Sequence, residues 1–271
     1  MFKRNHGELN IAQQCRLLGI SRSSVYSTPR GESEQNLALM REIKAVFEDK
    51  PFMGVWQMQA WLRLHDHTVG LKRVRRLMRQ MHLMPIYQRP KTTVPHPEDK
   101  RHPYFVEISA PNQVWSADIT YIPMRKGFLY LVAIIDWYSR KALSWRPSAT
   151  MDVDFCIDAL EEALTRYGRP EIFNTDQGSQ FTSMDFTNIL QSRGIRISMD
   201  GRGRWRDNVI IERFWRSLKY ECVYLYAFED GFEARQIIAS WVGFYNRERP
   251  HSSLGGLTPD MEYKWEVKKA A

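Results

Sequence analysis

Cysteine is scarce in this chain, with only Cys15, Cys156 and Cys222 among 271 residues. Their odd number and wide spacing exclude a disulfide framework and a paired-cysteine metal site, so we expect three ordinary packed thiols. The sequence also lacks any run of 18 apolar residues that could span a bilayer. No N-terminal apolar run resembles a signal peptide. These absences predict an intracellular protein, cytoplasmic and without a membrane partner.

Acidic residues are few in the first part of the chain. Residues 1–101 hold 18 Lys and Arg against 9 Asp and Glu, whereas residues 102–271 hold 21 against 22. The net charge of +8 therefore comes from the first part alone. Such an asymmetry is typical of a polyanion-binding module joined to a second domain, and it favours association with the nucleoid. A solvated basic face is the alternative.

Residues 8–28 carry a helical pattern followed by a break. Apolar residues recur at helical spacing up to Leu18, Gly19 breaks the helix, and Ser21 can cap a second, polar helix. This order predicts a helix-turn-helix in which Arg22 and Ser23 contact DNA. A small helical hairpin without DNA-binding function is the alternative.

Three further helices are predicted at residues 33–49, 57–65 and 71–82. The last one interleaves five basic residues with Val74, Leu77 and Met78. Such a helix buries its apolar side and offers its basic side to phosphates, so Arg73 and Arg76 are candidate DNA contacts. A solvated basic side is again the alternative.

Five prolines between residues 88 and 112 mark a linker. We therefore divide the chain into a helix-turn-helix-like segment (1–31), a helical basic DNA-binding region (32–87), the linker (88–110) and a catalytic core (111–265).

The rest of the chain alternates strand and helix patterns. The near-continuous apolar run 128–136 (FLYLVAIID) is typical of a strand buried on both faces. Strands are predicted at 114–122, 128–136, 142–145, 170–174 and 195–199, and helices at 152–167, 181–193, 207–224 and 232–245. This order indicates an α/β domain of the ribonuclease-H-like class, a mixed sheet flanked by helices, preceded by an all-α region.

Three acidic residues occupy unusual places in that pattern. Asp118 lies within a strand, Asp176 directly follows one, and Glu212 lies in a helix. Carboxylates that converge from such elements suit Mg²⁺ or Mn²⁺, and two such ions can stabilise both oxygens of a phosphodiester displacement. Each acid alone could equally be a surface or ion-paired residue.

Two spacings favour a shared site. Between Asp176 and Glu212 lie 35 residues, and Lys219 follows Glu212 by two helical turns, on the same helix face. On this helix Lys219, Arg216 and Asn208 are candidate DNA contacts. The preceding loop adds Arg202, Arg204 and Trp205, the last as a stacking platform for an unpaired base, although an ordinary turn is the alternative.

Five segments of the chain resemble the second-reading-frame transposases of bacterial insertion sequences, whose catalytic core is similar to that of retroviral integrases. They are PNQVWSADITYIPM (111–124), GFLYLVAIIDWYSRKALSW (127–145), FNTDQGSQFTS (173–183), ISMDGRGRWRDNVIIERFWRSLKYE (197–221) and FYNRERPHSSLGGLTP (244–259). His251 falls in the last segment, where we expect it to pack the C-terminal part of the chain.

The resemblance implies that Asp118, Asp176 and Glu212 form the catalytic, metal-binding triad, with Lys219 as the basic residue beyond it. In this family the enzyme nicks transposon ends, and the freed 3′-hydroxyl attacks target DNA. The implied partners are transposon-end and target DNA, further copies of the chain, and a first-frame product.

One segment departs from the family pattern. The family usually carries a Tyr-Gly-Ser/Tyr-Arg type of sequence between its N-terminal helices, whereas this chain has Met53-Gly54-Val55-Trp56. A catalytically silent DNA-binding remnant or regulator of the element is therefore the alternative function. A transcription regulator that uses only residues 8–28 is a third, which the length of the second domain disfavours.

Overall fold

A computed structural model of the protein describes residues 7–27, 31–86, 108–199 and 209–270. The chain divides into two compact units, residues 1–42 and 43–271. Nearly all of the predicted linker lies outside the described residues, as do Arg202, Arg204, Trp205 and Asn208. In the described ranges no helix is both long and apolar enough to cross a membrane.

The first unit begins with two short helices, α1 (Ile11–Leu18) and α2 (Arg22–Tyr26). Asn10 and Gln13 cap α1 reciprocally through hydrogen bonds of 2.9 and 3.0 Å. Gly19 ends α1 in the left-handed conformation at φ 64°. Ser21 precedes α2 as predicted, but its hydroxyl contacts the hydroxyl of Ser23 at 2.6 Å and does not cap the helix.

The helix α3 (Glu34–Asp49) spans the boundary of the units, and α4 (Val55–Leu64) and α5 (Leu71–Gln80) follow it. The amide of Gln59 donates to the Val69 carbonyl at 3.0 Å and so fastens α4 to the turn before α5. On α5 the residues Val74, Leu77 and Met78 are buried. The exposed residues are Lys72, Arg75, Arg76, Arg79 and Gln80. The predicted amphipathic basic helix is confirmed.

A five-stranded sheet with strand order β3-β2-β1-β4-β5 forms the centre of the second unit. The strands are β1 (Val114–Pro123), β2 (Phe128–Asp136), β3 (Ala142–Ser148), β4 (Ile172–Thr175) and β5 (Arg196–Met199). The first three pair antiparallel, whereas β4 and β5 run parallel to β1. This mixed sheet confirms the predicted ribonuclease-H-like class.

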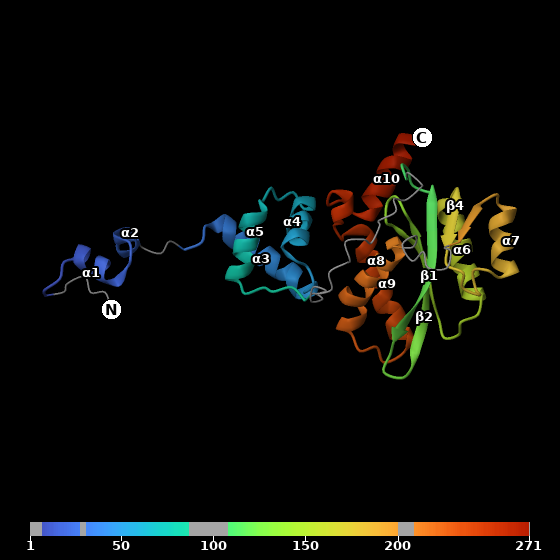
Figure 1. Ribbon diagram of the computed structural model, residues 1–271, viewed down its shortest axis with the longest axis horizontal. Coiled ribbons are helices and arrows are strands. Elements are labelled where there is room, and N and C mark those ends of the chain that lie inside the picture. The colour runs from blue at the N-terminus through green and yellow to red at the C-terminus, as the bar shows by residue number, and fades with distance from the viewer. Residues whose placement is uncertain (1–6, 28–30, 87–107, 200–208, 271) are drawn as a thin grey trace, which may run out of the picture. The chain divides into compact units, whose positions relative to one another are not determined.

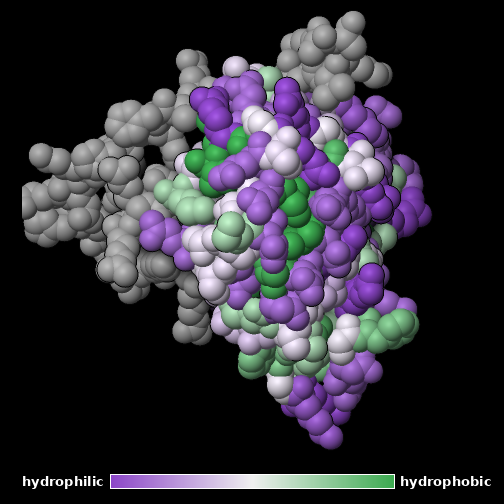
Figure 2. Space-filling model, turned by 90° about the vertical axis from the view of Figure 1, so that its right-hand side faces the viewer, coloured by the Kyte–Doolittle hydropathy of each residue, from purple (hydrophilic) through white to green (hydrophobic). Residues whose placement is uncertain are grey.

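Helices cover both faces of the sheet (Figure 1). Leu131 and Ala133 of β2 pack on the side of α8 (Val209–Glu221) and α9 (Gly231–Arg247). Val132 and Ile134 pack on the side of α6 (Asp154–Tyr167) and α7 (Met184–Ser192). The run 128–136 is therefore apolar on both sides, as predicted. The outer surface of the α6 and α7 side is mostly hydrophilic and carries a narrow hydrophobic strip (Figure 2).

The C-terminal part closes the domain with two short 3₁₀ helices (Val223–Leu225 and Ser252–Leu254) and with α10 (Pro259–Ala270), which the sequence pattern did not predict. Tyr263 of α10 hydrogen-bonds with Asn112, and Asp260 pairs with Lys141 at 2.9 Å. These long-range contacts attach α10 to the residues just before β1 and just before β3.

Candidate active site

Asp118 lies in the middle of the central strand β1, as predicted. Its partner across the ladder is Ala133 of β2, whose side chain belongs to the core under α8 and α9. Because directly paired residues point to the same side of a sheet, the Asp118 carboxylate faces α8.

Two donors hold the Asp118 carboxylate. The indole Nε1 of Trp215 donates to Oδ2 at 2.8 Å, and the backbone N–H of Ile119 donates to Oδ1 at 2.8 Å. Trp215 belongs to α8, so the first of these bonds joins β1 to that helix. The carboxylate therefore has a fixed orientation.

Asp176 directly follows β4, again as predicted. β4 runs parallel to β1 with Asn174 opposite Ser116, and each aspartate lies two residues beyond that pair. The register thus places Asp176 at the level of Asp118. The Asp176 side chain is exposed, and its Oδ1 accepts the backbone N–H of Gly178 at 3.0 Å.

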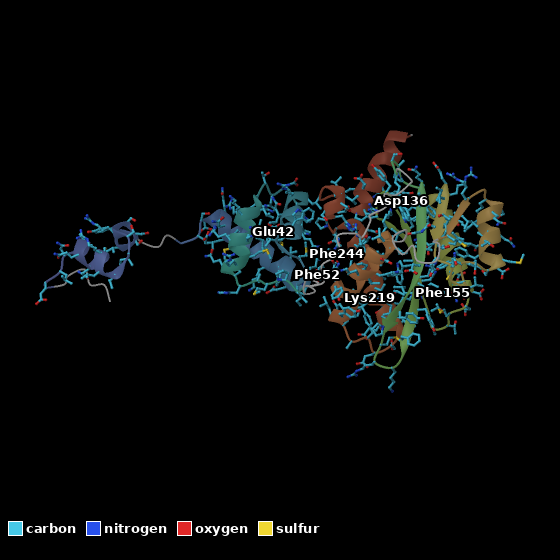
Figure 3. The ribbon with its side chains drawn as sticks, viewed as in Figure 1. Glu42, Phe52, Asp136, Phe155, Lys219 and Phe244 are labelled. Atoms are coloured by element: carbon cyan, nitrogen blue, oxygen red, sulfur yellow. The ribbon has the colours of Figure 1, made fainter. Side chains whose placement is uncertain are left out.

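Glu212 is an exposed residue in the first turn of α8. Trp215 follows it by one turn, so the contact of Trp215 with Asp118 brings this end of α8 to β1. Farther along the helix, Arg216 is exposed and Lys219 is half-buried. Figure 3 places Lys219 on the α8 side of the sheet and Phe155 on the α6 side.

The three carboxylates interact electrostatically. The pKa of Asp118 is raised to about 6, mainly by burial and to a smaller extent by the negative charges of Asp176 and Glu212. Hydrogen bonds from Trp215 and Ile119 act in the opposite direction. The side chains are therefore near enough for their charges to repel. Spacing alone did not guarantee that three acids distant in sequence would meet in this way.

Hard oxygen donors with unrelieved negative charge fit a divalent cation such as Mg²⁺ or Mn²⁺. Asp118, Asp176 and Glu212 supply such donors from three different elements. Over the described residues, however, no set of three or more acidic, His or Cys side chains is close enough to enclose a metal ion.

The other predicted DNA contacts belong to other elements of the chain than the triad does. Arg22 and Ser23 are exposed residues of α2 in the first unit. Arg73 and Arg76 lie on α5, where Arg76 is exposed and Arg73 is half-buried. Of the predicted contacts near the triad, only Arg216 and Lys219 fall within the described residues.

Sequence reasoning missed Trp215 and Gly178, which contact two of the three carboxylates. Trp215 follows Glu212 at the spacing of one helical turn, which is the available signal, but its position also fits the apolar stripe of α8. Gly178 lies two residues after Asp176, a spacing common for a carboxylate that accepts a backbone N–H in a turn.

Three protein families match parts of this chain. Two integrase core domain families match residues 108–204 and 193–259, and an HTH-like domain family matches residues 34–91. The last match covers α3, α4 and α5 and lies downstream of residues 8–28, for which a helix-turn-helix stays a prediction.

Individual relatives cover nearly the whole chain. Transposase InsF for insertion sequence IS3A of Escherichia coli K12 is 31% identical over 96% of this chain and 96% of its own. The insertion element IS600 uncharacterized 31 kDa protein of Shigella sonnei is 32% identical over 90% of this chain and 95% of its own. Among solved structures, the HTLV-2 integrase catalytic core domain in complex with magnesium is 23% identical, with a TM-score of 0.43, over 57% of this chain and 97% of its own.

Proposed function

The chain belongs to the insertion-sequence transposases that carry an integrase core domain, and we propose that it cuts its element's DNA ends and joins them to target DNA. It is a DNA transposase, a polynucleotidyl transferase. The observation that carries the proposal is the arrangement of the elements that hold the three acids. The bond from Trp215 to Asp118 brings the Glu212 end of α8 to β1. The register of β4 on β1 sets Asp176 at the level of Asp118. A buried carboxylate kept beside two others is costly to the fold, as is common where function requires it.

In the proposed reaction, water attacks the phosphodiester at the element's end, the bond from phosphorus to the 3′-oxygen breaks, and a 3′-hydroxyl is freed. This hydroxyl then attacks a target phosphodiester, forming one phosphorus–oxygen bond as another breaks. Asp118, Asp176 and Glu212 would hold two Mg²⁺ or Mn²⁺ ions, which supply stabilisation of the attacking and leaving oxygens when bound. No covalent intermediate between enzyme and DNA is needed.

We assign DNA binding to the basic first part of the chain and the chemistry to the second part. Residues 1–31 and 32–87 would bind DNA, using Arg22, Ser23, Arg73 and Arg76, and residues 111–265 would carry the chemistry behind the linker 88–110. Lys219 and Arg216 on α8 would contact the end being cut, together with Asn208, Arg202, Arg204 and Trp205. The support is the exposed basic side of α5 and the basic residues after Glu212 on α8.

DNA is the partner that this function requires. We further propose that copies of the chain act together on paired ends, that a first-frame product takes part, and that the protein works in the cytoplasm at the nucleoid. The family resemblance supports these finer assignments.

The test is strand transfer with oligonucleotides that carry the element's own ends, with Mg²⁺ or Mn²⁺ added. We expect Asp118→Asn, Asp176→Asn and Glu212→Gln each to abolish joining while DNA binding persists. If the unmutated protein binds the ends but never joins them, even with the first-frame product present, a catalytically silent DNA-binding protein is the correct function.

A further inference from the structure

One hydrogen bond connects two of the elements that carry the triad. Trp215 Nε1 on α8 donates to Asp118 Oδ2 on β1 across 2.8 Å, although 97 positions separate the two residues in sequence. Glu212 lies one turn before Trp215 on the same helix. The bond therefore sets the orientation of Asp118 and also the position of Glu212 relative to it.

The Asp118 carboxylate can accept more than the two hydrogen bonds that it receives. An ionised carboxylate has about four acceptor sites, two on each oxygen. The Trp215 indole takes one on Oδ2 and the Ile119 N–H takes one on Oδ1. Each oxygen thus keeps one acceptor site that points in a fixed direction. A metal site requires ligands that are held in position in this way before the cation binds.

Trp215 is itself held rigidly. Its side chain is 6% exposed and packs at 5.1 Å from the Phe214 ring, within the core between the sheet and the helices α8 and α9. A buried indole N–H without an acceptor is unfavourable, so the packed ring keeps its bond to Asp118.

We propose that Trp215 is a positioning residue for divalent-metal binding, acting through its hydrogen bond to the Asp118 carboxylate. The inference rests on the proposed function, in which Asp118 is a metal ligand. Groups that orient a metal-binding side chain commonly change metal affinity or activity by about 10- to 100-fold when they are lost.

Trp241 on α9 provides a matched control. It is also 6% exposed and lies in the same core, but its Nε1 has no hydrogen-bond partner among the described residues. Trp→Phe therefore removes similar packing at either position, but it removes a carboxylate donor only at Trp215.

The experiment compares Trp215→Phe, Trp241→Phe and Asp118→Asn in the full-length chain. Calorimetry measures the affinity for Mn²⁺, thermal unfolding measures stability without metal, and strand transfer is followed against Mn²⁺ concentration. For Trp215→Phe we expect Mn²⁺ affinity to fall about 10-fold or more, with joining restored at high Mn²⁺. For Trp241→Phe we expect Mn²⁺ affinity within about two-fold of the unmutated protein. We expect its loss of stability to be similar to that of Trp215→Phe.

Equal Mn²⁺ affinities in the two Trp→Phe variants would overturn the positioning role. The same holds if Trp215→Phe lowers stability but leaves the Mn²⁺ dependence of joining unchanged. Asp118→Asn separates this failure from failure of the proposed function. If Asp118→Asn abolishes joining while both Trp→Phe variants behave alike, only the positioning inference fails. If Asp118→Asn joins ends normally, the metal-binding triad itself is wrong.

Discussion

The backbone N–H of Gly178 donates to Oδ1 of Asp176 across 3.0 Å, and a Cβ atom on Gly178 would lie 2.9 Å from that same oxygen. Real Cβ atoms essentially never approach a heavy atom so closely. The turn after β4 therefore orients Asp176 through a position where only glycine fits without displacing the carboxylate.

Gly178→Ala is expected to rotate the Asp176 carboxylate and to lower the rate of strand transfer by about 100-fold, since a displacement near 1 Å at a reacting centre has that effect. The matched control is Gly70→Ala, where a Cβ would meet nothing within 4 Å. Joining rates and thermal unfolding of both variants give the answer. Normal joining by Gly178→Ala would show that the orientation of Asp176 is unimportant.

Asp118→Asn is expected to stabilise the metal-free protein at pH 8. The folded-state pKa of Asp118, about 6, lies above its ordinary value of 3.8. Ionised Asp118 therefore destabilises the fold above pH 6, and this penalty disappears below pH 4. After allowing for the acceptor that Asn lacks, we expect a gain of about 1 kcal/mol at pH 8 and less at pH 5.

Urea unfolding at the two pH values measures this gain. Asp158→Asn on the exposed side of α6 is the control, with an expected change below about 0.5 kcal/mol. Destabilisation by Asp118→Asn at pH 8 would contradict the electrostatic reading of the site.

The ion pair between Glu221 and Arg249 fastens the end of α8 to the segment after α9. Arg249 donates from Nε and Nη2 to the two Glu221 oxygens at 2.7 and 2.5 Å, and both side chains are nearly buried. We expect Glu221→Gln or Arg249→Met alone to cost about 3 kcal/mol, because each leaves a buried group without its partner. The double variant should cost less than the sum, as measured by urea unfolding. Strict additivity would mean that the pair is not coupled.

His251 predicts a loss of stability in acid. Burial, followed by the positive charges of Arg249 and Arg140, lowers its pKa to about 3 from 6.5. The unfolded chain then takes up a proton below pH 6.5 that the folded chain refuses, so this contribution to stability is full above pH 6.5 and falls as pH falls towards 3.

The difference between the unmutated protein and His251→Gln isolates this effect. Urea unfolding at pH 7 and pH 5 should show a smaller acid loss for the variant, by up to about 1.4 kcal/mol per pH unit. Equal acid losses in both proteins would contradict a buried, neutral His251.

The basic side of α5 predicts a salt-dependent contribution to DNA binding. Arg73→Gln combined with Arg76→Gln should reduce the slope of log affinity against log salt by about 1.8 if both residues contact phosphates. Lys126→Gln in the exposed turn between β1 and β2 is the control. Titrations of end DNA by fluorescence anisotropy at several salt concentrations measure the slopes. An unchanged slope in the double variant would mean that the basic side of α5 is solvated and does not contact DNA.

Local patterns predicted most of the secondary structure because each depends on residues close in sequence. The run 128–136 was predicted as a strand and is one, with the same bounds. The helix predicted at 181–193 begins later, at Met184, because the Ser183 hydroxyl accepts the Phe186 N–H and caps it. The helix α10 was not predicted because its contacts with Asn112 and Lys141 lie more than 100 positions away.

The sequence by itself predicted which acids belong together, since the gap of 35 residues and the position of Lys219 depend only on numbering and helical periodicity. Only the tertiary structure decided how those acids are held. The bond from Trp215 to Asp118, the register of β4 on β1 and the approach of Gly178 to Asp176 came from the packed domain. Periodicity places residues on one face of one element, but the partner of that face depends on how separate elements pack around a shared core.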